Sequence, residues 1–254
     1  MNWLPPNGAL DGVRLDQLLR WNLAAVFWLF VAAQALLVAA LLWRMRPSAN
    51  RDAGGGRPGR AFFAGELLVL LAITGLYIVM DVTGHQLWAA RREAGPAEHP
   101  VQVEVTGVQF EWYFRYPGAD GVYGRIRPTM VSAPNGNPLG LDPTDPHSAD
   151  DIVSSMLVLP VGRPVDLRLR SQDVIHGFFI PGMRLKQDAI PGMLGHLQFT
   201  PTVVGDYVIL CSQVCGLGHN RMQARLRVLP EADYGRWIAG REKSLLADAS
   251  GARP

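Results

Sequence analysis

The chain contains only two cysteines among its 254 residues, Cys211 and Cys215, and they lie close together. Two cysteines cannot build a disulfide framework. The sequence also lacks a Cys-x-x-Cys-His stretch, which excludes a haem attached covalently in the c-type manner. The net charge is only +2, so nucleic-acid binding has no electrostatic support.

Apolar residues make up 48% of the chain, an ordinary share, but they are concentrated in two early runs. The first run, residues 22–43, offers about 20 residues without a charge, enough to cross the hydrocarbon core of a bilayer. The second run, residues 61–82, has Glu66 and Asp81 near its ends. We predict a transmembrane helix for each run; the alternative is a pair of helices buried in a globular core.

The connection between the two runs, residues 44–60, carries five arginines and one aspartate. Short loops rich in Arg stay on the cytoplasmic side, so we expect residues 1–95 to form a hairpin with a cytoplasmic loop. Both termini and the rest of the chain then lie on the periplasmic or extracellular side.

From Val101 onward the pattern changes to short segments that alternate apolar and polar residues between Gly and Pro turns. Such segments, including residues 151–159, predict an antiparallel β-sandwich or Greek-key barrel over residues 96–230. Residues 231–254 are predicted to form a C-terminal helix and tail. The segment 118–151, rich in Gly, Pro and Asp, is predicted to be a long loop ordered by Asp and Asn side-chain turns.

The densest cluster of metal-ligating residues follows the pattern Cys-x3-Cys-x3-His-x2-Met, formed by Cys211, Cys215, His219 and Met222. Soft sulfur together with imidazole is the donor set that proteins offer to copper. One Cys, two His and a weak Met describe a mononuclear copper site, and the second Cys allows two bridging thiolates to hold two copper ions. His176 upstream would complete the imidazole pair, and the backbone carbonyl of Gln213 is a candidate weak axial ligand.

Two other interpretations of the cysteine pair remain open. Cys211 and Cys215 are candidates for a disulfide if the domain is extracytoplasmic, but that leaves His219 and Met222 unexplained. A structural zinc site would use two Cys and two His, and Met is a poor ligand for zinc.

Three segments, residues 173–176, 185–192 and 211–222, together resemble subunit II of haem–copper oxygen reductases, the family that carries the binuclear copper centre CuA. The resemblance covers roughly residues 20–230 and implies a cupredoxin-like fold for the β domain. It also implies a set of metal ligands, which comprises His176, Cys211, Cys215, His219 and Met222 through their side chains and Gln213 through its carbonyl. Many family members have Glu at the position of Gln213, where the carboxylate helps to hold magnesium, and a neutral amide weakens the case for magnesium here.

The resemblance also implies roles for aromatic and acidic residues. A comparable aromatic stretch in the family docks the electron donor and conducts electrons to copper. We therefore take Phe110, Trp112 and Tyr113 as candidates for electron entry, although Phe110 stands where the family usually has Trp; the alternative is that these aromatics fill the core. Glu66 matches an acid at the mouth of a proton channel in the family, and otherwise is an interfacial carboxylate.

The resemblance implies an electron-entry subunit of a respiratory terminal oxidase in a bacterial-type inner membrane. Electrons would come from a cytochrome c or a small copper protein and pass to haem in subunit I, where oxygen is reduced to water. The membrane hairpin would contact lipid, and no oxygen chemistry is expected on this chain alone. The alternatives are a copper domain like that of nitrous oxide reductase and a membrane-anchored protein for copper binding or delivery. A quinol-oxidase subunit II would share the fold but lack the copper ligands.

Overall fold

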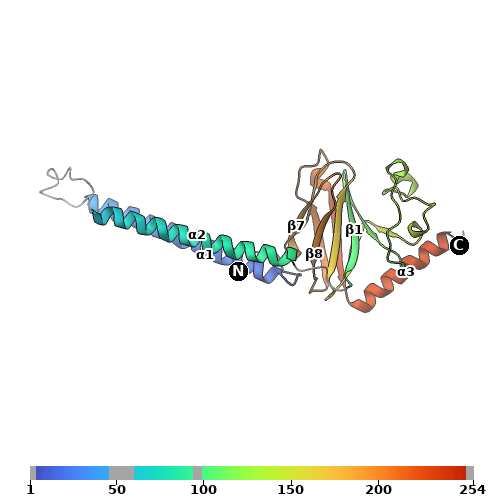
Figure 1. The fold of residues 1–254 in the computed structure, drawn as a ribbon, viewed down its shortest axis with the longest axis horizontal. Helices are drawn as coiled ribbons and strands as arrows, with labels where there is room; N and C mark the ends of the chain where they lie inside the picture. The colour runs from blue at the N-terminus through green and yellow to red at the C-terminus, as the bar shows by residue number, and fades with distance from the viewer. Residues whose placement is uncertain (1–3, 46–59, 94–98, 250–254) are drawn as a thin grey trace. The chain divides into compact units, whose positions relative to one another are not determined.

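The protein is described by a computed structural model that covers residues 4–45, 60–93 and 99–249. The chain divides into two compact units, one formed by Arg14–Ala94 and the other by Met1–Val13 with Gly95–Pro254. The first unit holds two long helices and the second holds the β-strands and the last helix (Figure 1).

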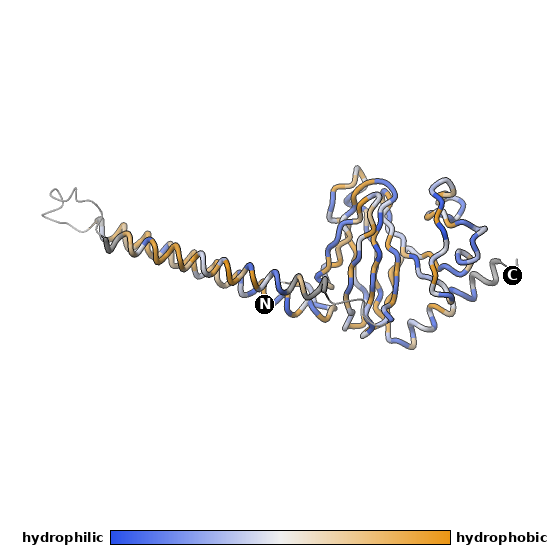
Figure 2. The backbone as a smooth tube through the Cα atoms, in the orientation of Figure 1, coloured by the Kyte–Doolittle hydropathy of each residue, from blue (hydrophilic) through white to orange (hydrophobic). Residues whose placement is uncertain are grey.

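The helical unit consists of α1 (Gly12–Met45) and α2 (Arg60–Glu93), along which apolar residues dominate (Figure 2). Segments Gly12–Trp43 and Phe63–Gln86 are long and apolar enough to cross a membrane. Each helix has 34 residues, or ~50 Å at 1.5 Å per residue, and so exceeds the apolar core of a bilayer. The helices extend beyond the predicted 22–43 and 61–82 because helix geometry continues through charged flanks that hydropathy leaves out. The predicted loop 44–60 lies almost wholly outside the described residues.

The second unit is a sandwich of two five-stranded sheets. One sheet has the order β3-β2-β1-β5-β8 and the other has the order β4-β10-β9-β6-β7. The strands are β1 (Val101–Val108), β2 (Glu111–Tyr116), β3 (Ile152–Ser154), β4 (Met156–Pro160), β5 (Val165–Ser171), β6 (His176–Ile180), β7 (Leu185–Ala189), β8 (Gly195–Phe199), β9 (Gly205–Cys211) and β10 (Gln223–Leu229). The predicted class, a two-helix hairpin followed by a cupredoxin-like sandwich, is confirmed.

The pairing is mostly antiparallel, but each sheet contains one parallel pair, β1 with β5 and β4 with β10. The single strand expected over residues 151–159 is in fact two strands, because the chain changes sheet at Ser155 between β3 and β4. The Ser154 hydroxyl accepts a hydrogen bond from the Met156 amide at this corner. Strands that bend from one sheet into the other close the edge of a sandwich.

Alternating strand residues fill the space between the sheets. On β1 and β2 the inward side chains are fully buried, among them Val103, Val105 and Phe114. The sheets are also joined by polar contacts, because the hydroxyl of Tyr116 on β2 donates to the Val158 carbonyl on β4 and accepts from the Val158 amide. A packed and cross-linked sandwich holds the loops at its ends in fixed positions.

Two segments outside the sheets pack on this core. Helix α3 (Glu231–Ala249) places Trp237 against Tyr116 and stacks it on Tyr234. The segment before α1 bonds to the sandwich through its backbone, with Gly8 between Gly182 and Thr202 and with Ala9 almost fully buried. Residues near the N-terminus therefore belong to the β unit.

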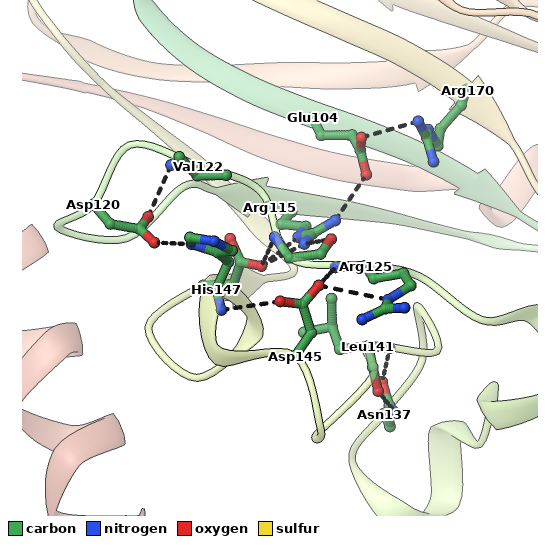
Figure 3. A network of polar contacts seen from close by, with 12 residues as sticks. Glu104, Arg115, Asp120, Val122, Arg125, Asn137, Leu141, Asp145, His147 and Arg170 are labelled. Atoms are coloured by element: carbon green, nitrogen blue, oxygen red, sulfur yellow. Dashed lines mark hydrogen bonds and ion pairs between the residues drawn. The ribbon is translucent and has the colours of Figure 1, made fainter.

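The segment 118–151 forms a long connection that contains three short 3-10 turns. Asp120, Asn137, Asp142 and Asp145 each accept hydrogen bonds from nearby backbone amides, as expected for side-chain turns. Figure 3 shows Arg115 of β2 beside Glu104 of β1. The Arg115 guanidinium also donates to the Gly124 carbonyl, which links the segment to the sheet.

Candidate metal centre

The predicted ligands come from neighbouring elements of the second sheet. His176 follows β5 and is the first residue of β6, and Cys211 is the last residue of β9. The amide of Cys211 donates to the Met222 carbonyl at 3.2 Å, which closes the base of the loop that carries Cys215 and His219. Since β6, β9 and β10 are adjacent, their ends bring these side chains to one end of the sandwich.

The donor atoms lie within a few ångströms of one another. The ligand atoms of His176, Cys211 and Cys215 are all within 4.8 Å of each other. The Cys215 sulfur is 3.8 Å from that of Cys211, 3.7 Å from His219 Nδ1 and 3.7 Å from the Met222 sulfur. The Gln213 carbonyl oxygen is 3.1 Å from the Cys211 sulfur. The structure thus brings together all six predicted ligands.

The two cysteines are free thiols in this arrangement. Their sulfur separation of 3.8 Å is far longer than the ~2.05 Å of a disulfide bond. The disulfide interpretation therefore has no support in the structure, and the sulfur atoms face the imidazoles of His176 and His219.

One ring nitrogen of His176 has a hydrogen-bond partner and the other has none. Its Nε2 lies 2.7 Å from the Asp173 carboxylate, while its Nδ1 is buried without a hydrogen-bond partner. A hydrogen atom on Nε2 leaves the Nδ1 lone pair available, and a buried polar atom without a partner is costly unless something fills that role. A soft metal ion among the two sulfurs suits this atom, so the donor set fits copper.

Asp173 contacts the candidate ligand His176, a contact that was not predicted from the sequence. Although burial opposes it, hydrogen bonds from His176 and from the backbone amides of Gln109 and Val174 lower the pKa of Asp173. The carboxylate therefore stays ionised and orients the His176 ring, as carboxylates commonly do behind a metal-bound imidazole. Its position three residues before His176 was the only signal in the sequence.

The thiol of Cys215 is hard to ionise without a cation nearby. Burial, a hydrogen bond with Cys211 and the charge of that residue raise the pKa of Cys215 to about 11. Two adjacent thiolates repel each other, and the low polarity of the site strengthens that repulsion. A bound metal cation reverses this by stabilising both thiolates.

Close packing behind His176 depends on a glycine. A Cβ atom on Gly107 of β1 would lie 2.8 Å from the His176 ring and 3.1 Å from Trp112. Only glycine leaves room for the imidazole against the strand. The ring is thus fixed by Asp173 at one edge and by β1 on one face.

The three candidate aromatics take different places. Trp112 is buried and packs edge-on against His176, with 5.8 Å between ring centroids. Phe110 is half-buried beside the metal loop, where it lines a shallow depression with Leu217 and Arg221. Tyr113 follows Trp112 on β2 and points to the opposite face, where it bonds to Glu111. The structure brings Phe110 and Trp112 to the cluster and leaves Tyr113 outside it.

Glu66 lies in the helical unit, four residues inside the apolar segment Phe63–Gln86, with an exposed side chain. An acid at that place in an apolar helix is costly to leave in lipid, so it is a candidate for contact with another protein.

A family model described as cytochrome c oxidase subunit II, periplasmic domain, matches residues 101–228, which is half of the chain. The chain belongs to this family. The match includes all ten strands of the sandwich, apart from Leu229 at the end of β10, and the six residues predicted as metal ligands. Together with the two apolar helices, membership in the family indicates a membrane-anchored protein.

Individual members of the family show the same likeness. An alternative cytochrome c oxidase subunit 2 from Bradyrhizobium diazoefficiens is 41% identical over 139 residues, covering 54% of this chain and 50% of that protein. A cytochrome c oxidase subunit 2 from Cereibacter sphaeroides is 26% identical over 214 residues, covering 80% of this chain and 68% of that protein. The match spans half of the Bradyrhizobium protein and about a third of two further relatives, the cytochrome c oxidase subunits 2 of Synechocystis sp. and Thermostichus vulcanus.

Among solved structures, the periplasmic domain of subunit II of cytochrome oxidase from Bradyrhizobium japonicum is similar. It is 23% identical, and the match covers 57% of this chain and 95% of that domain with a TM-score of 0.41.

Proposed function

We propose that this chain is the electron-entry subunit of a haem–copper terminal oxidase and that its cluster holds a binuclear copper centre. The observation that carries the proposal is the convergence of two thiols, two imidazoles and a thioether around the buried Cys215. Membership in the cytochrome c oxidase subunit II family favours this function over a nitrous-oxide-reductase-like domain or a copper-delivery protein.

Six residues would hold the copper. Cys211 and Cys215 would each supply a sulfur, His176 and His219 would each supply a ring nitrogen, and Met222 and the Gln213 carbonyl would complete the set. Copper supplies one-electron oxidation and reduction in such a site. The exposed Gln213 side chain offers an amide in place of a carboxylate, so the proposal leaves magnesium out.

The protein's part in electron transfer is to hold these ligands still and to keep water away from them. Strands β6, β9 and β10 position the candidate ligands, Trp112 packs against His176, and Phe178 packs against Trp112. The exposed apolar side chains of Val214 and Leu217 lie on the same loop as Cys215 and His219. We propose that the donor, a cytochrome c or a small copper protein, approaches there and at Phe110, and that electrons leave toward haem in subunit I.

The same proposal sets the location of each part. The five arginines of residues 44–60 keep that loop in the cytoplasm, so the β domain lies on the periplasmic or extracellular side of a bacterial-type inner membrane. This is the side where a soluble donor would arrive. Glu66, near the cytoplasmic start of α2, is proposed to face subunit I at the mouth of a proton path.

The test replaces both cysteines in the assembled oxidase. We expect Cys211→Ser/Cys215→Ser to assemble but to lose copper from this subunit and to stop oxidising the donor. His196→Ala, which removes an imidazole from β8, is the control and should keep wild-type copper content and rate. A double variant with wild-type copper content and donor oxidation would show that the proposal is wrong.

A further inference from the structure

The turn between β1 and β2, formed by Gln109 and Phe110, connects two segments that carry candidate ligands. The Gln109 backbone amide donates to one oxygen of Asp173 at 2.7 Å, and the other oxygen of that carboxylate is 2.7 Å from His176 Nε2. The Gln109 side-chain amide donates to the Cys215 carbonyl at 2.5 Å. One residue therefore contacts both the support of His176 and the backbone of Cys215.

The contact with Cys215 reaches the centre of the cluster. The sulfur of Cys215 lies 3.7–3.8 Å from three other donor atoms, so a small movement of its backbone changes several separations together. Cys215 lies between the end of β9 and the 3-10 turn His219–Arg221, so it is outside the hydrogen-bonded pairing of the strands. A hydrogen bond from outside the loop is the kind of contact that fixes such a carbonyl.

The next residue confirms how closely the loop approaches the turn. Gly216 has a φ of +139°, a conformation that L side chains rarely adopt. A Cβ atom there would lie 2.8 Å from the Gln109 side-chain nitrogen and 3.1 Å from the Phe110 ring. The loop thus folds directly over the side chain that bonds to Cys215.

We propose that Gln109 is a positioning residue for the metal centre, which sets the distance between the His176 segment and the Cys215 loop. The inference rests on the proposed copper function and deepens it, because it assigns a second support to the centre beside Asp173. The side chain acts through Cys215 and the backbone amide acts through Asp173, so a side-chain substitution isolates the contact with Cys215.

The experiment compares Gln109→Met with wild type in the full chain loaded with copper. Methionine keeps the length and bulk of the side chain and removes the donor. We expect a shifted sulfur-to-copper absorption, altered copper hyperfine splitting, and loss of copper to a chelator about 10-fold faster than in wild type. The unfolding midpoint of the metal-free chain should stay within about 4 °C of wild type.

Two further variants sharpen the comparison. Gln109→Glu places a carboxylate against the Cys215 carbonyl, so we expect it to lose copper faster than Gln109→Met, and it also serves if that variant does not fold. Gln198→Met, on β8 of the first sheet, makes the same chemical change elsewhere and should leave the spectrum and the chelation rate unchanged.

The outcomes separate the two proposals. Wild-type spectra and chelation rates in both Gln109 variants would overturn the positioning role while leaving the copper function intact. A lower unfolding midpoint with unchanged spectra would also overturn it, because the residue would then serve the fold alone. A wild-type chain that takes up no copper would contradict the proposed function and this inference with it.

Discussion

Met222 is the candidate copper ligand whose contribution to the reduction potential can be isolated most cleanly. It is almost fully buried with its sulfur 3.7 Å from that of Cys215, whereas Met193 is exposed on the β7–β8 connection. Met222→Leu conserves volume and removes a weak ligand, so we expect copper to remain bound and the reduction potential to shift. The free energy of unfolding should change by less than about 1.5 kcal/mol.

A potentiometric titration measures this shift, and Met193→Leu is the matched control. If both variants kept the wild-type potential, Met222 would be a packing residue and not a ligand.

Single residues also show how far the sequence could lead. The spacing of Cys211, Cys215, His219 and Met222 was enough to predict that these side chains lie together, because a short loop confines them. The roles of Asp173 and Gln109 were not foreseen. Gln109 contacts segments that are far away in the chain, and the role of Asp173 depends on which ring nitrogen of His176 is free. Likewise, nothing in the pattern of residues 151–159 shows that the chain changes sheet at Ser155.

Among the elements, the segment before α1 is an unexpected part of the β unit. A Cβ atom on Gly8 would lie 2.5 Å from the Tyr207 hydroxyl, at the place where Gly8 bonds to Gly182 and Thr202. Gly8→Ala should therefore lower the free energy of unfolding of the β unit by about 1–3 kcal/mol. Gly235→Ala, in the exposed helix α3 with open space around it, should raise it by about 0.4–1 kcal/mol.

Denaturant unfolding tests whether the free energy of unfolding falls in Gly8→Ala and rises in Gly235→Ala. Equal stability of Gly8→Ala and wild type would mean that the N-terminal segment only rests on the sandwich.

The loop 118–151 carries an ion pair that depends on pH. A hydrogen bond with Asp120 raises the pKa of His147, and the same bond lowers the pKa of Asp120. The contribution of His147 to stability is complete below its ordinary pKa of 6.5 and is lost as pH rises through the raised value. The contribution of Asp120 is present above 3.8 and is lost as pH falls through its lowered value.

The pair is therefore strongest between those two pKa values, and the effect is small because both side chains are solvent-exposed. An NMR titration of the His147 ring should give a higher pKa in wild type than in Asp120→Asn. Identical titration curves in the two proteins would show that the pair does not form in solution.

At the scale of the whole molecule, the two units differ in how they bury their apolar residues. In the most apolar stretches of α1 and α2, the described residues are not buried within the chain, as expected for helices that meet lipid or another membrane subunit. The β unit buries its own core and places its sulfur and imidazole donors at one end. The two apolar helices and the β-sandwich were predictable from the sequence, because hydropathy and strand alternation are signals averaged over many residues.

We propose that one centre in this chain holds two copper ions, with Cys211 and Cys215 among its ligands. The most direct measurement is the EPR spectrum of the purified full chain loaded with copper, together with its copper-to-protein ratio. We predict a ratio of about two and a hyperfine pattern with more lines than one copper nucleus can give, since bridging sulfur shares the unpaired electron. A four-line spectrum of a single copper ion, or a silent protein with stoichiometric zinc, would contradict the account.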